Sequence, residues 1–500
     1  MMKPCPGLYC GLDVGTSGCK ALIADEDGRV IASARRSYDI ISPRPGWLEL
    51  DAEQVFGRVL DVLGECRAAI QKRAIVSMAV STQGEAIIPV DKDGKVLHNG
   101  ILTFDNRNIA SSELLGSRIT KSEIMKKTGA PLHPMFSLTK VMWFAENEPA
   151  IYQKADKFLC FGEFISMRLG AEPCIDRTMA ARTMAFDINT LSWSDEIINI
   201  AGIDYDKLPR VVESGTVIGR VSAPVARKTG INDDMLLVAG AHDQLCCALG
   251  AGVADSGAAM DSLGTTESIV CVSDRLVVSE EMIKNNVPCY PYVCRGMYSY
   301  LTFLSCCGAA VQWLAQGLLN GVMQPAELDG LCESLPVNAG LFVLPHFAGT
   351  GTPALNPRAK AEISGLTLST TAGDLHRAIL ESTAFEARMN VEVMRRCGIE
   401  PHTFRCIGGG AKSRTWLQIK ADVLGLPMTA MRVEEAGCYG AAMLALKGYK
   451  PDLSLEKLSA QWAGPGTAVE PNLGIREVYD EKYERYKELY INRAMMNGLQ

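Results

Sequence analysis

The strongest constraint on the fold is a pattern that occurs twice, once near the start of the chain and once just past its middle. The stretch GLDVGTSGCKALI, residues 11–23, places a small-residue turn between two apolar runs, and AAMDSLGTTESIVCVSD, residues 258–274, repeats that arrangement. Each stretch predicts a strand, a tight turn of glycine and hydroxyl residues, and a second strand. Hairpins with Gly-Thr turns are common, but each of these opens a half of similar length, so we interpret the chain as an internal duplication.

The segments that follow each hairpin alternate between strand and helix patterns, which is typical of the α/β class. In residues 50–73 the apolar side chains recur at helical spacing, and Asp51 is the expected N-cap. A long helix is expected over residues 373–398. A chain of 500 residues is too long for one core. We expect two domains, the first half (residues 1–252) and the second half (residues 253–500).

The composition is that of a globular protein and excludes several classes of function. Charged residues make up 21% and hydrophobic residues 47% of the chain, which argues against disorder. The net charge of −7 without a long basic run argues against a nucleic-acid partner. No apolar run reaches the ~20 residues of a membrane helix, and the N-terminus lacks a signal-peptide core. Seventeen scattered cysteines are typical of buried thiols in a reducing compartment, so we expect a cytoplasmic protein.

The first turn has the residues that a phosphate site needs. A glycine-rich turn after a strand lets backbone amides approach phosphate oxygens, and Thr16 and Ser17 add hydroxyl donors. Asp13 precedes the turn, and a carboxylate beside phosphates requires a cation between them, so Asp13 is a candidate Mg²⁺ ligand through water. The alternative is that Asp13 only caps the turn. Lys20 is either a point charge near the phosphates or a solvated lysine.

Two later loops could hold the other side of the same ligand. Gly264 and Thr265 in the repeated turn would supply an opposing phosphate clamp. The loop IGGGAKSR, residues 407–414, contains Gly409 and Gly410 between a strand pattern and a helix pattern, which indicates close approach of the backbone to a ligand. Its spacing is not that of a Walker loop. A tight structural turn remains the alternative.

Asp243 is the most notable acid in the sequence. It lies between the apolar strand pattern MLLVAG and the small-residue helix pattern LCCALGAG, and an acid at a strand end is well placed to accept a proton from a hydroxyl. The alternative is a helix N-cap. Residues 81–85 (STQGE) and 104–107 (FDNR) interrupt apolar stretches with polar groups. Recognition of a polyol needs several such groups to converge on one cleft, although each stretch could also be a polar turn.

Taken together, these stretches resemble the FGGY family of carbohydrate kinases along essentially the whole chain. GLDVGTSGCKALI is similar to the family's first phosphate motif, SLGTTES to its second, AGAHDQLCCALGAG to the segment with the catalytic aspartate, residues 364–386 to the C-terminal signature, and IGGGAKSRTWLQIKADVLG to the adenosine motif. The resemblance implies two duplicated ribonuclease H-like domains of the actin-like ATPase and sugar kinase type around a central cleft. ATP phosphates would be held there from both sides.

The resemblance also implies a set of site residues, with ATP and Mg²⁺ as cofactors. Asp243 would be the catalytic base and Asp13 the residue near Mg²⁺. The nucleotide site would comprise Asp13, Thr16, Ser17, Lys20, Gly264, Thr265, Gly308, Gln312, Gly409, Gly410, Ala411 and Arg414. The acceptor site would comprise Gln83, Gly84, Glu85, Asp105, Asp243 and Gln244.

The acceptor loop departs from both well-known patterns of the family. Xylulose kinases usually carry Gln-Met-His-Gly there and glycerol kinases carry Gln-Arg-Glu, whereas this chain has Gln83, Gly84 and Glu85. Met135 stands where glycerol kinases place a substrate-contacting tyrosine, and FDNR resembles the Asp-x-Arg of ketose kinases. We expect phosphorylation of a ketose similar to xylulose, with glycerol or another polyol as the alternative acceptor.

A third interpretation comes from another class of protein. The chain could be an actin-like nucleotide-binding protein without transferase activity, but the retained Asp243 argues against that reading. The sequence leaves the oligomeric state open, with a homodimer among the alternatives.

Overall fold

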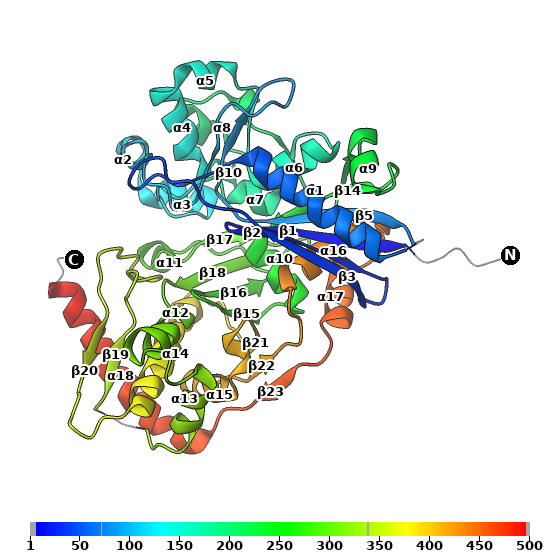
Figure 1. Ribbon diagram of the computed structural model, residues 1–500. Helices are drawn as coiled ribbons and strands as arrows, with labels where there is room; N and C mark the ends of the chain where they lie inside the picture. The colour runs from blue at the N-terminus through cyan, green and yellow to red at the C-terminus, as the bar shows by residue number, and fades with distance from the viewer. Residues whose placement is uncertain (1–6, 72, 338–339, 497–500) are drawn as a thin grey trace.

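The computed structural model describes residues 7–71, 73–337 and 340–496, and its first half is built on a six-stranded mixed sheet (Figure 1). The strand order is β13-β14-β5-β1-β2-β3. Strands β1, β2 and β3 are antiparallel neighbours, β5 and β14 run parallel to β1, and β13 is antiparallel to β14. The bounds are β1 (Leu8–Val14), β2 (Gly18–Ala24), β3 (Val30–Ser37), β5 (Ile75–Thr82), β13 (Val217–Arg220) and β14 (Leu236–His242).

The second half repeats this topology in a seven-stranded sheet of order β17-β18-β16-β15-β21-β22-β23. Its antiparallel β15, β16 and β18 correspond to β1, β2 and β3, and its parallel β21 and β22 correspond to β5 and β14. The bounds are β15 (Ala258–Leu263), β16 (Glu267–Ser273), β17 (Cys289–Pro291), β18 (Tyr298–Leu304), β21 (Thr403–Ile407), β22 (Met428–Ala430) and β23 (Thr467–Val469). The predicted α/β fold with two related halves is confirmed.

Amphipathic helices cover the outer faces of both sheets. On the first sheet, α1 (Ala52–Ala69) begins after Asp51. The carboxylate of Asp51 accepts hydrogen bonds from the backbone N–H groups of Glu53 and Gln54, so Asp51 is the N-cap, as the sequence predicts. The second sheet packs against α14 (Ala372–Arg396) and α15 (Arg414–Leu424), and α18 (Arg476–Met496) packs on these two helices. Each half therefore has its own hydrophobic core.

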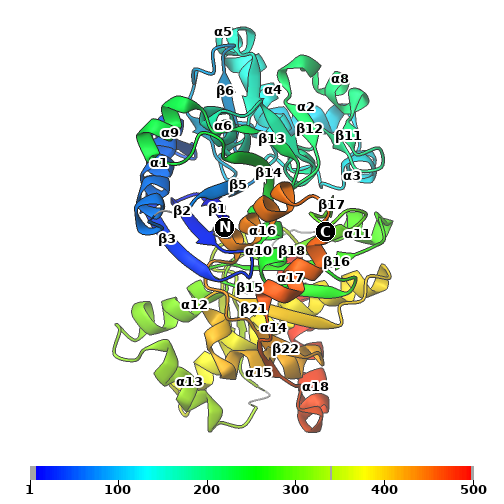
Figure 2. The same cartoon turned by 90° about the vertical axis from the view of Figure 1, so that its right-hand side faces the viewer.

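Two helices at the junction of the halves pack unusually closely. Helix α10 (Asp243–Gly250) crosses α16 (Ala436–Tyr449), and both lie between the two sheets (Figure 2). A Cβ on Gly440 would lie 2.0 Å from the carbonyl oxygen of Cys246, and one on Gly250 would lie 2.2 Å from that of Ala436. Only glycine permits this crossing. Although α16 belongs to the second half of the sequence, it packs against β1, β5 and β14 of the first sheet.

A helical layer covers the far end of the first half, at the top of Figure 1. It comprises α2 (Ile109–Arg118), α3 (Lys121–Thr128), α4 (Ser137–Asn147), α5 (Pro149–Lys154) and α8 (Asp195–Ala201), and has a separate apolar core. Short helix α7 (Arg177–Ala181) lies between this layer and β14.

The remaining elements are short or peripheral. They are β4 (Glu49–Leu50), β6 (Ile88–Val90), β7 (Gly100–Ile101), β8 (Lys157–Leu159), α6 (Phe161–Leu169), β9 (Cys174–Asp176), β10 (Phe186–Asp187), β11 (Ser192–Trp193), β12 (Arg210–Val212), α9 (Ala223–Thr229), α11 (Glu280–Lys284), α12 (Gly308–Gln312), α13 (Pro325–Glu333), β19 (Phe342–Leu344), β20 (Glu362–Ser364) and α17 (Leu455–Ala463). Within the described ranges, every helix falls short of the length or the hydrophobicity needed to cross a membrane. All sixteen described cysteines are free thiols.

Candidate active site

The first predicted phosphate turn joins β1 to β2 and presents its hydroxyl residues outward. Thr16 and Ser17 are exposed, and the backbone N–H of Gly15 donates to the carbonyl of Gly18 at 3.0 Å, which closes the turn. The hydroxyl of Tyr38 hydrogen-bonds the carbonyl oxygens of Gly15 and Gly18, at 2.6 and 2.9 Å. Tyr38, which no local sequence pattern singled out, therefore fixes the turn and leaves its outer side open to a ligand.

The second predicted turn, residues 264–266, joins β15 to β16 and is fixed by the start of α12. The N–H of Gly308 donates to the carbonyl of Gly264 at 2.9 Å, and the N–H of Ala309 donates to the carbonyl of Thr265 at 3.1 Å. The side chain of Thr265 is exposed. Gly308, which the family resemblance predicted, thus lies directly beside the second turn.

An open cavity of about 610 Å³ lies next to this second turn. Six predicted nucleotide residues line it: Gly264, Thr265, Gly308, Gln312, Gly409 and Gly410. Its volume is within the range of cavities that hold small molecules and cofactors. Ala411 and Arg414 lie outside the described lining of this cavity, Ala411 buried and Arg414 exposed at the start of α15.

Other residues that the sequence analysis did not identify also line this cavity. Asp329 of α13 and His376 of α14 face each other, with Oδ1 and Nε2 2.7 Å apart. Trp416 of α15 also lines the cavity, and its Nε1 donates to Thr383 Oγ1 at 3.0 Å. These residues come from three separate helices and form no local motif, so only the fold brings them together.

Asp243 is the first residue of α10 and follows the last residue of β14. Its Oδ1 accepts a hydrogen bond from the N–H of Gln244 at 2.6 Å and lies 3.3 Å from His242 Nε2, while 28% of the side chain stays exposed. Burial raises the pKa of Asp243 to about 7, and the charges of Asp13 and Glu85 add to the rise. Burial also holds the pKa of His242 well below its usual value, so its imidazole is neutral. An accessible carboxylate with a pKa near 7 is suited to general-base chemistry.

Asp13 is the second carboxylate of this region and the predicted Mg²⁺ neighbour. Its Oδ1 accepts a hydrogen bond from Ser81 Oγ at 2.6 Å, and burial raises its pKa. The charge of Asp13 also raises the pKa of Asp243, so the two carboxylates are within electrostatic reach. A pair of acids beside a phosphate turn fits a divalent cation. Among the described residues, no group of three acidic, histidine or cysteine ligands forms a complete metal site, so phosphate oxygens and water would supply the other ligands.

Lys20, predicted either to contact the phosphates or to be solvated, pairs with Glu435 in this structure. Its Nζ lies 2.8 Å from Glu435 Oε2, and the two side chains are 42% and 35% exposed. Its positive charge lowers the pKa of Asp13, against the effect of burial. In this structure Lys20 therefore joins the first sheet to the residue before α16, and a phosphate would have to share its ammonium group with Glu435.

The predicted acceptor loop, residues 81–85, continues from β5 and is tied to the first phosphate turn. Gln83 Oε1 accepts a hydrogen bond from Thr16 Oγ1 at 3.1 Å, and its Nε2 donates to a carbonyl of the turn at 3.3 Å. Behind the loop, buried Lys140 donates from Nζ to the carbonyl of Glu85 at 3.0 Å. Burial lowers the pKa of Lys140 to about 8. The carboxylate of Glu85 forms a buried ion pair with Arg182, a residue that the sequence analysis did not identify.

Asp105 differs from the other predicted acceptor residues because all its lone pairs are in use. Its Oδ1 accepts from the backbone N–H and the Nε of Arg107, both at 2.9 Å. Its Oδ2 accepts from the N–H of Leu48 at 2.6 Å and from Arg107 Nη2 at 2.8 Å. The Arg107 guanidinium is itself stacked on Trp47 at 3.8 Å. The geometry therefore gives Asp105 a structural part in its loop, and its contact with the acceptor stays a prediction.

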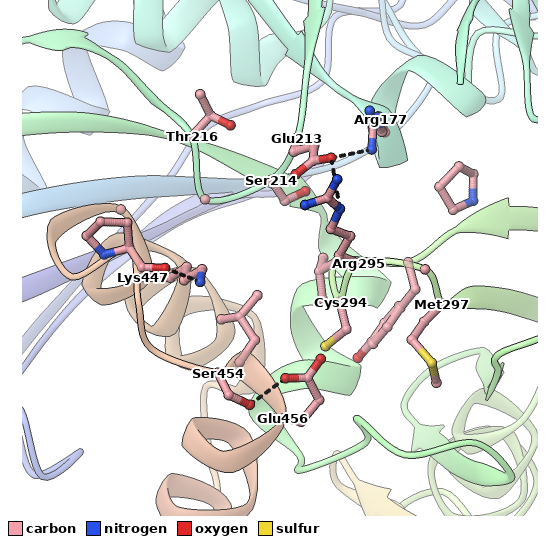
Figure 3. A pocket seen from close by; sticks show the side chains of 18 of the residues that line it. Arg177, Glu213, Ser214, Thr216, Cys294, Arg295, Met297, Lys447, Ser454 and Glu456 are labelled. Carbon is pink, nitrogen blue, oxygen red and sulfur yellow. Dashed lines mark hydrogen bonds and ion pairs between the residues drawn. The ribbon is translucent and has the colours of Figure 1, made fainter. Parts of the chain in front are cut away.

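A second pocket, of about 530 Å³, lies where segments of both halves meet (Figure 3). Arg177 and Arg295 approach the carboxylate of Glu213 at 2.6 and 3.9 Å, and Cys294 and Glu456 lie on the opposite side. The described lining of this pocket includes none of the predicted nucleotide or acceptor residues. We therefore place the candidate active site at Asp13, Asp243 and the two phosphate turns.

Comparison with known proteins assigns the chain to a family. A xylulose kinase of Bacillus subtilis (strain 168) is 28% identical over 497 residues, which is 97% of each chain. A glycerol kinase of Solidesulfovibrio magneticus is 32% identical over 468 residues, 90% of this chain and 92% of the relative. The crystal structure of xylulose kinase from Rhodospirillum rubrum superposes with a TM-score of 0.90 at 27% identity, covering 97% of this chain and 98% of that one.

Two family models cover most of the sequence. The N-terminal domain model of the FGGY family of carbohydrate kinases matches residues 8–250, and the C-terminal domain model matches residues 259–449. The chain therefore belongs to the FGGY family of carbohydrate kinases, which are phosphotransferases with an alcohol group as acceptor.

Proposed function

We propose that this protein transfers the γ-phosphoryl group of ATP to a hydroxyl of a ketose such as xylulose, with Asp243 as the general base. One observation carries the proposal: β14, which ends at His242 directly before Asp243, pairs that histidine with Thr82 of the acceptor loop, and on the other side of β5 the strand β1 pairs Asp13 with Ser81. Asp243 is within electrostatic reach of Asp13 and Glu85, whose charges both raise its pKa. A base at this place can reach a hydroxyl that faces a bound triphosphate.

Catalysis of this reaction depends on positioning of the reactants and neutralisation of their charge more than on covalent chemistry by the protein. The backbone amides of the two turns, with Thr16 and Thr265, would hold the phosphates. Asp243 would take the proton of the acceptor hydroxyl. At the same time the oxygen of that hydroxyl would bond to the γ-phosphorus, and the bond between the γ-phosphorus and the bridging oxygen would break and release ADP. General-base assistance of this kind contributes about 10²- to 10⁴-fold to the rate.

Mg²⁺ fits this site as a companion of ATP. When bound, it supplies positive charge to the phosphate oxygens, and Asp13 would hold it through water. The mutual repulsion of Asp13 and Asp243 supports this role, because a cation relieves it.

The acceptor class follows from the loop and from the relatives. The named relatives include xylulose kinases and glycerol kinases, and the chain keeps Gln83 and Glu85 of the glycerol-kinase pattern but has Gly84 between them. We favour a ketose and keep glycerol or another polyol as the second candidate. A nucleotide-binding protein without transferase activity would not need a partly exposed acid with a pKa near 7 within electrostatic reach of Asp13.

A panel of acceptors tests the proposal. ADP release is measured with Mg²⁺ and ATP in a coupled assay, with xylulose, other five- and six-carbon ketoses, glycerol and longer polyols as acceptors. We expect the highest kcat/KM with a ketose. A preference for glycerol would transfer the assignment to the second candidate, and the absence of transfer to every acceptor would refute the proposal.

A further inference from the structure

Arg182 brings a buried guanidinium to the acceptor loop. It follows the last residue of α7 and pairs with Glu85, and the two side chains are 8% and 3% exposed. Its Cζ lies 5.4 Å from the ring centre of Phe136 and 5.0 Å from that of Tyr290. The negative charge of Asp243 also raises the pKa of Arg182. Its Nε is buried and finds no hydrogen-bond partner among the described residues, so a donor close to the candidate base is free.

Gly84 provides the space that this arrangement requires. A Cβ on residue 84 would lie 2.9 Å from Cδ2 of His242 and 3.4 Å from Nε of Arg182. The first of these distances is shorter than a normal contact between carbon atoms. A side chain at position 84 would therefore displace His242, while its Cβ would lie in ordinary contact with Arg182 Nε.

Tyr290 reaches the same place from the other half of the molecule. It lies on β17, the edge strand of the second sheet, and is 1% exposed. Its hydroxyl has no hydrogen-bond partner in the part of the chain that the structure describes. Burial raises the pKa of Tyr290 to about 12; the charge of Arg182 and its side-chain interaction with the phenol lower this pKa, and the charge of Glu85 raises it. The phenol is therefore neutral and lies beside the Arg182 guanidinium, without a hydrogen bond of normal geometry among the described residues.

Tyr292, which follows directly after the end of β17, shows that such a free hydroxyl is not typical of this segment. Tyr292 is also buried, and its hydroxyl donates to the carbonyl of Val253 at 2.5 Å. Buried polar groups without partners are rare and destabilising, which is why each one calls for an explanation. Three such groups belong to the acceptor region, because Gln244 Oε1, in the residue after Asp243, is also buried without a partner among the described residues; others, such as Thr302 Oγ1, lie elsewhere in the molecule.

The free groups match the chemistry of a polyhydroxylated molecule. Arg182 Nε is a donor, Gln244 Oε1 is an acceptor, and the Tyr290 hydroxyl can be either. Hydroxyl groups donate and accept, and a ketone oxygen accepts. A carboxylate is a poor match, because it would enter beside two acids, Glu85 and Asp243, while Arg182 is already paired with Glu85.

We propose that Arg182 and Tyr290 complete the acceptor site across the two halves, hydrogen-bond the acceptor, and together with Glu85 select neutral ketoses or polyols over sugar acids. This inference rests on the kinase function proposed above. Arg182 and Tyr290 are thus specificity-determining residues, and Tyr290 makes the second half a contributor to acceptor binding as well as to nucleotide binding.

The first test compares two substitutions of one kind in one segment, Tyr290→Phe on β17 and Tyr292→Phe just after it. Tyr290→Phe removes a hydroxyl without a protein partner, so we expect an unchanged or raised Tm and an acceptor KM raised about tenfold, the effect of one hydrogen bond of ~1.4 kcal/mol. Tyr292→Phe removes a satisfied hydroxyl, so we expect a lowered Tm and an unchanged KM. An unchanged acceptor KM in Tyr290→Phe, with wild-type enzyme active on that acceptor, overturns the inference for Tyr290.

The second test uses charge. The enzyme is assayed with a neutral ketose and with an aldonate such as gluconate, and the ratio of the two kcat/KM values is compared between wild type and Glu85→Gln. Removal of the Glu85 charge leaves the Arg182 guanidinium free to meet a carboxylate, so we expect the ratio to shift at least tenfold toward the aldonate. An unchanged ratio overturns the charge-selection part. Absence of phosphorylation by the wild-type enzyme would instead count against the proposed function itself.

Arg182→Lys gives a further measurement on the same pair. The lysine keeps the positive charge beside Glu85, so the protein avoids an unpaired buried carboxylate, but it lacks the Nε donor and the planar fork. We expect a raised acceptor KM and an unchanged KM for ATP. Equal rises in both KM values would contradict a role in acceptor recognition.

Discussion

The most informative perturbation of the folded state is Lys420→Met, because Lys420 is a buried cation beneath the second phosphate turn. Its Nζ lies 2.6 Å from Asp261 Oδ2 and 2.6 Å from Glu267 Oε1, and all three side chains are fully buried. Cys307, just before α12, donates from Sγ to Glu267 Oε2 at 3.3 Å. The lysine therefore joins α15 to both strands of the hairpin that carries the turn.

The magnitude follows from the charges left behind. Burial raises the pKa of both Asp261 and Glu267, and the Lys420 charge opposes that rise. Removal of one partner from a buried ion pair costs about 3–5 kcal/mol. A carboxyl group with an unfolded-state pKa of ~4.3 that must be neutral in the fold costs about 5 kcal/mol at pH 8 but only about 1.6 kcal/mol at pH 5.5.

The sign of the pH dependence is fixed by the direction of the shift. An acid whose pKa is higher in the folded state destabilises the fold increasingly as the pH rises above its unfolded-state pKa. Urea unfolding of Lys420→Met should therefore show a deficit relative to wild type that is large at pH 8 and several-fold smaller at pH 5.5. The exposed Lys412→Met is the control, with an expected change within ~0.5 kcal/mol.

A rescue variant separates charge from packing. Asp261→Asn and Glu267→Gln combined with Lys420→Met remove all three charges, and we expect most of the pH dependence to disappear. A Lys420→Met protein as stable as wild type at pH 8, or a deficit equal at both pH values, would refute the reasoning.

Three other predictions follow from the site and the junction. The kcat/KM for the acceptor should rise with pH through about 7, because Asp243 must be deprotonated to accept a proton; a flat profile between pH 6 and 8 would contradict its role. Gly440→Ala should lower the free energy of unfolding by about 1–3 kcal/mol, because the new Cβ would clash with a backbone carbonyl of α10. Gly330→Ala in α13, where nothing lies within 4 Å of the new Cβ, should raise the free energy of unfolding by up to ~1 kcal/mol. Thermal unfolding would distinguish the two variants. Lys20→Met should change stability by less than ~1 kcal/mol, since its pair with Glu435 is substantially exposed, and a larger loss in urea unfolding would mean that this pair anchors the junction.

The parts of the site that the sequence predicts are those with a local signature. Glycine and hydroxyl residues between two apolar runs are a local signal for a hairpin turn, which does not depend on partners far along the chain. Both turns therefore lie at the predicted positions. Asp243 is similar, because the change from a strand pattern to a helix pattern marks the position of the acid. The pKa of Asp243 could not be predicted in this way, since it depends on burial and on Asp13 and Glu85.

The parts that the sequence did not predict depend on partners far along the chain. Lys20 pairs with Glu435 near the opposite end of the sequence, and Glu85 pairs with Arg182, which follows α7 almost a hundred residues later. Neither pair leaves a pattern in a short window. Asp105 shows the converse: its saturation by nearby Arg107 and a backbone N–H is a matter of side-chain geometry that residue types alone do not determine.

The central claim is that Asp243 removes a proton from an acceptor hydroxyl while the γ-phosphoryl group of ATP is transferred. Transfer of label from γ-labelled ATP to a ketose by wild type and by Asp243→Asn measures this directly, with ADP affinity determined for both proteins. We predict a labelled sugar phosphate from wild type, and at least a hundredfold slower transfer by Asp243→Asn with ADP affinity unchanged. Transfer by Asp243→Asn at a rate close to that of wild type would contradict the account.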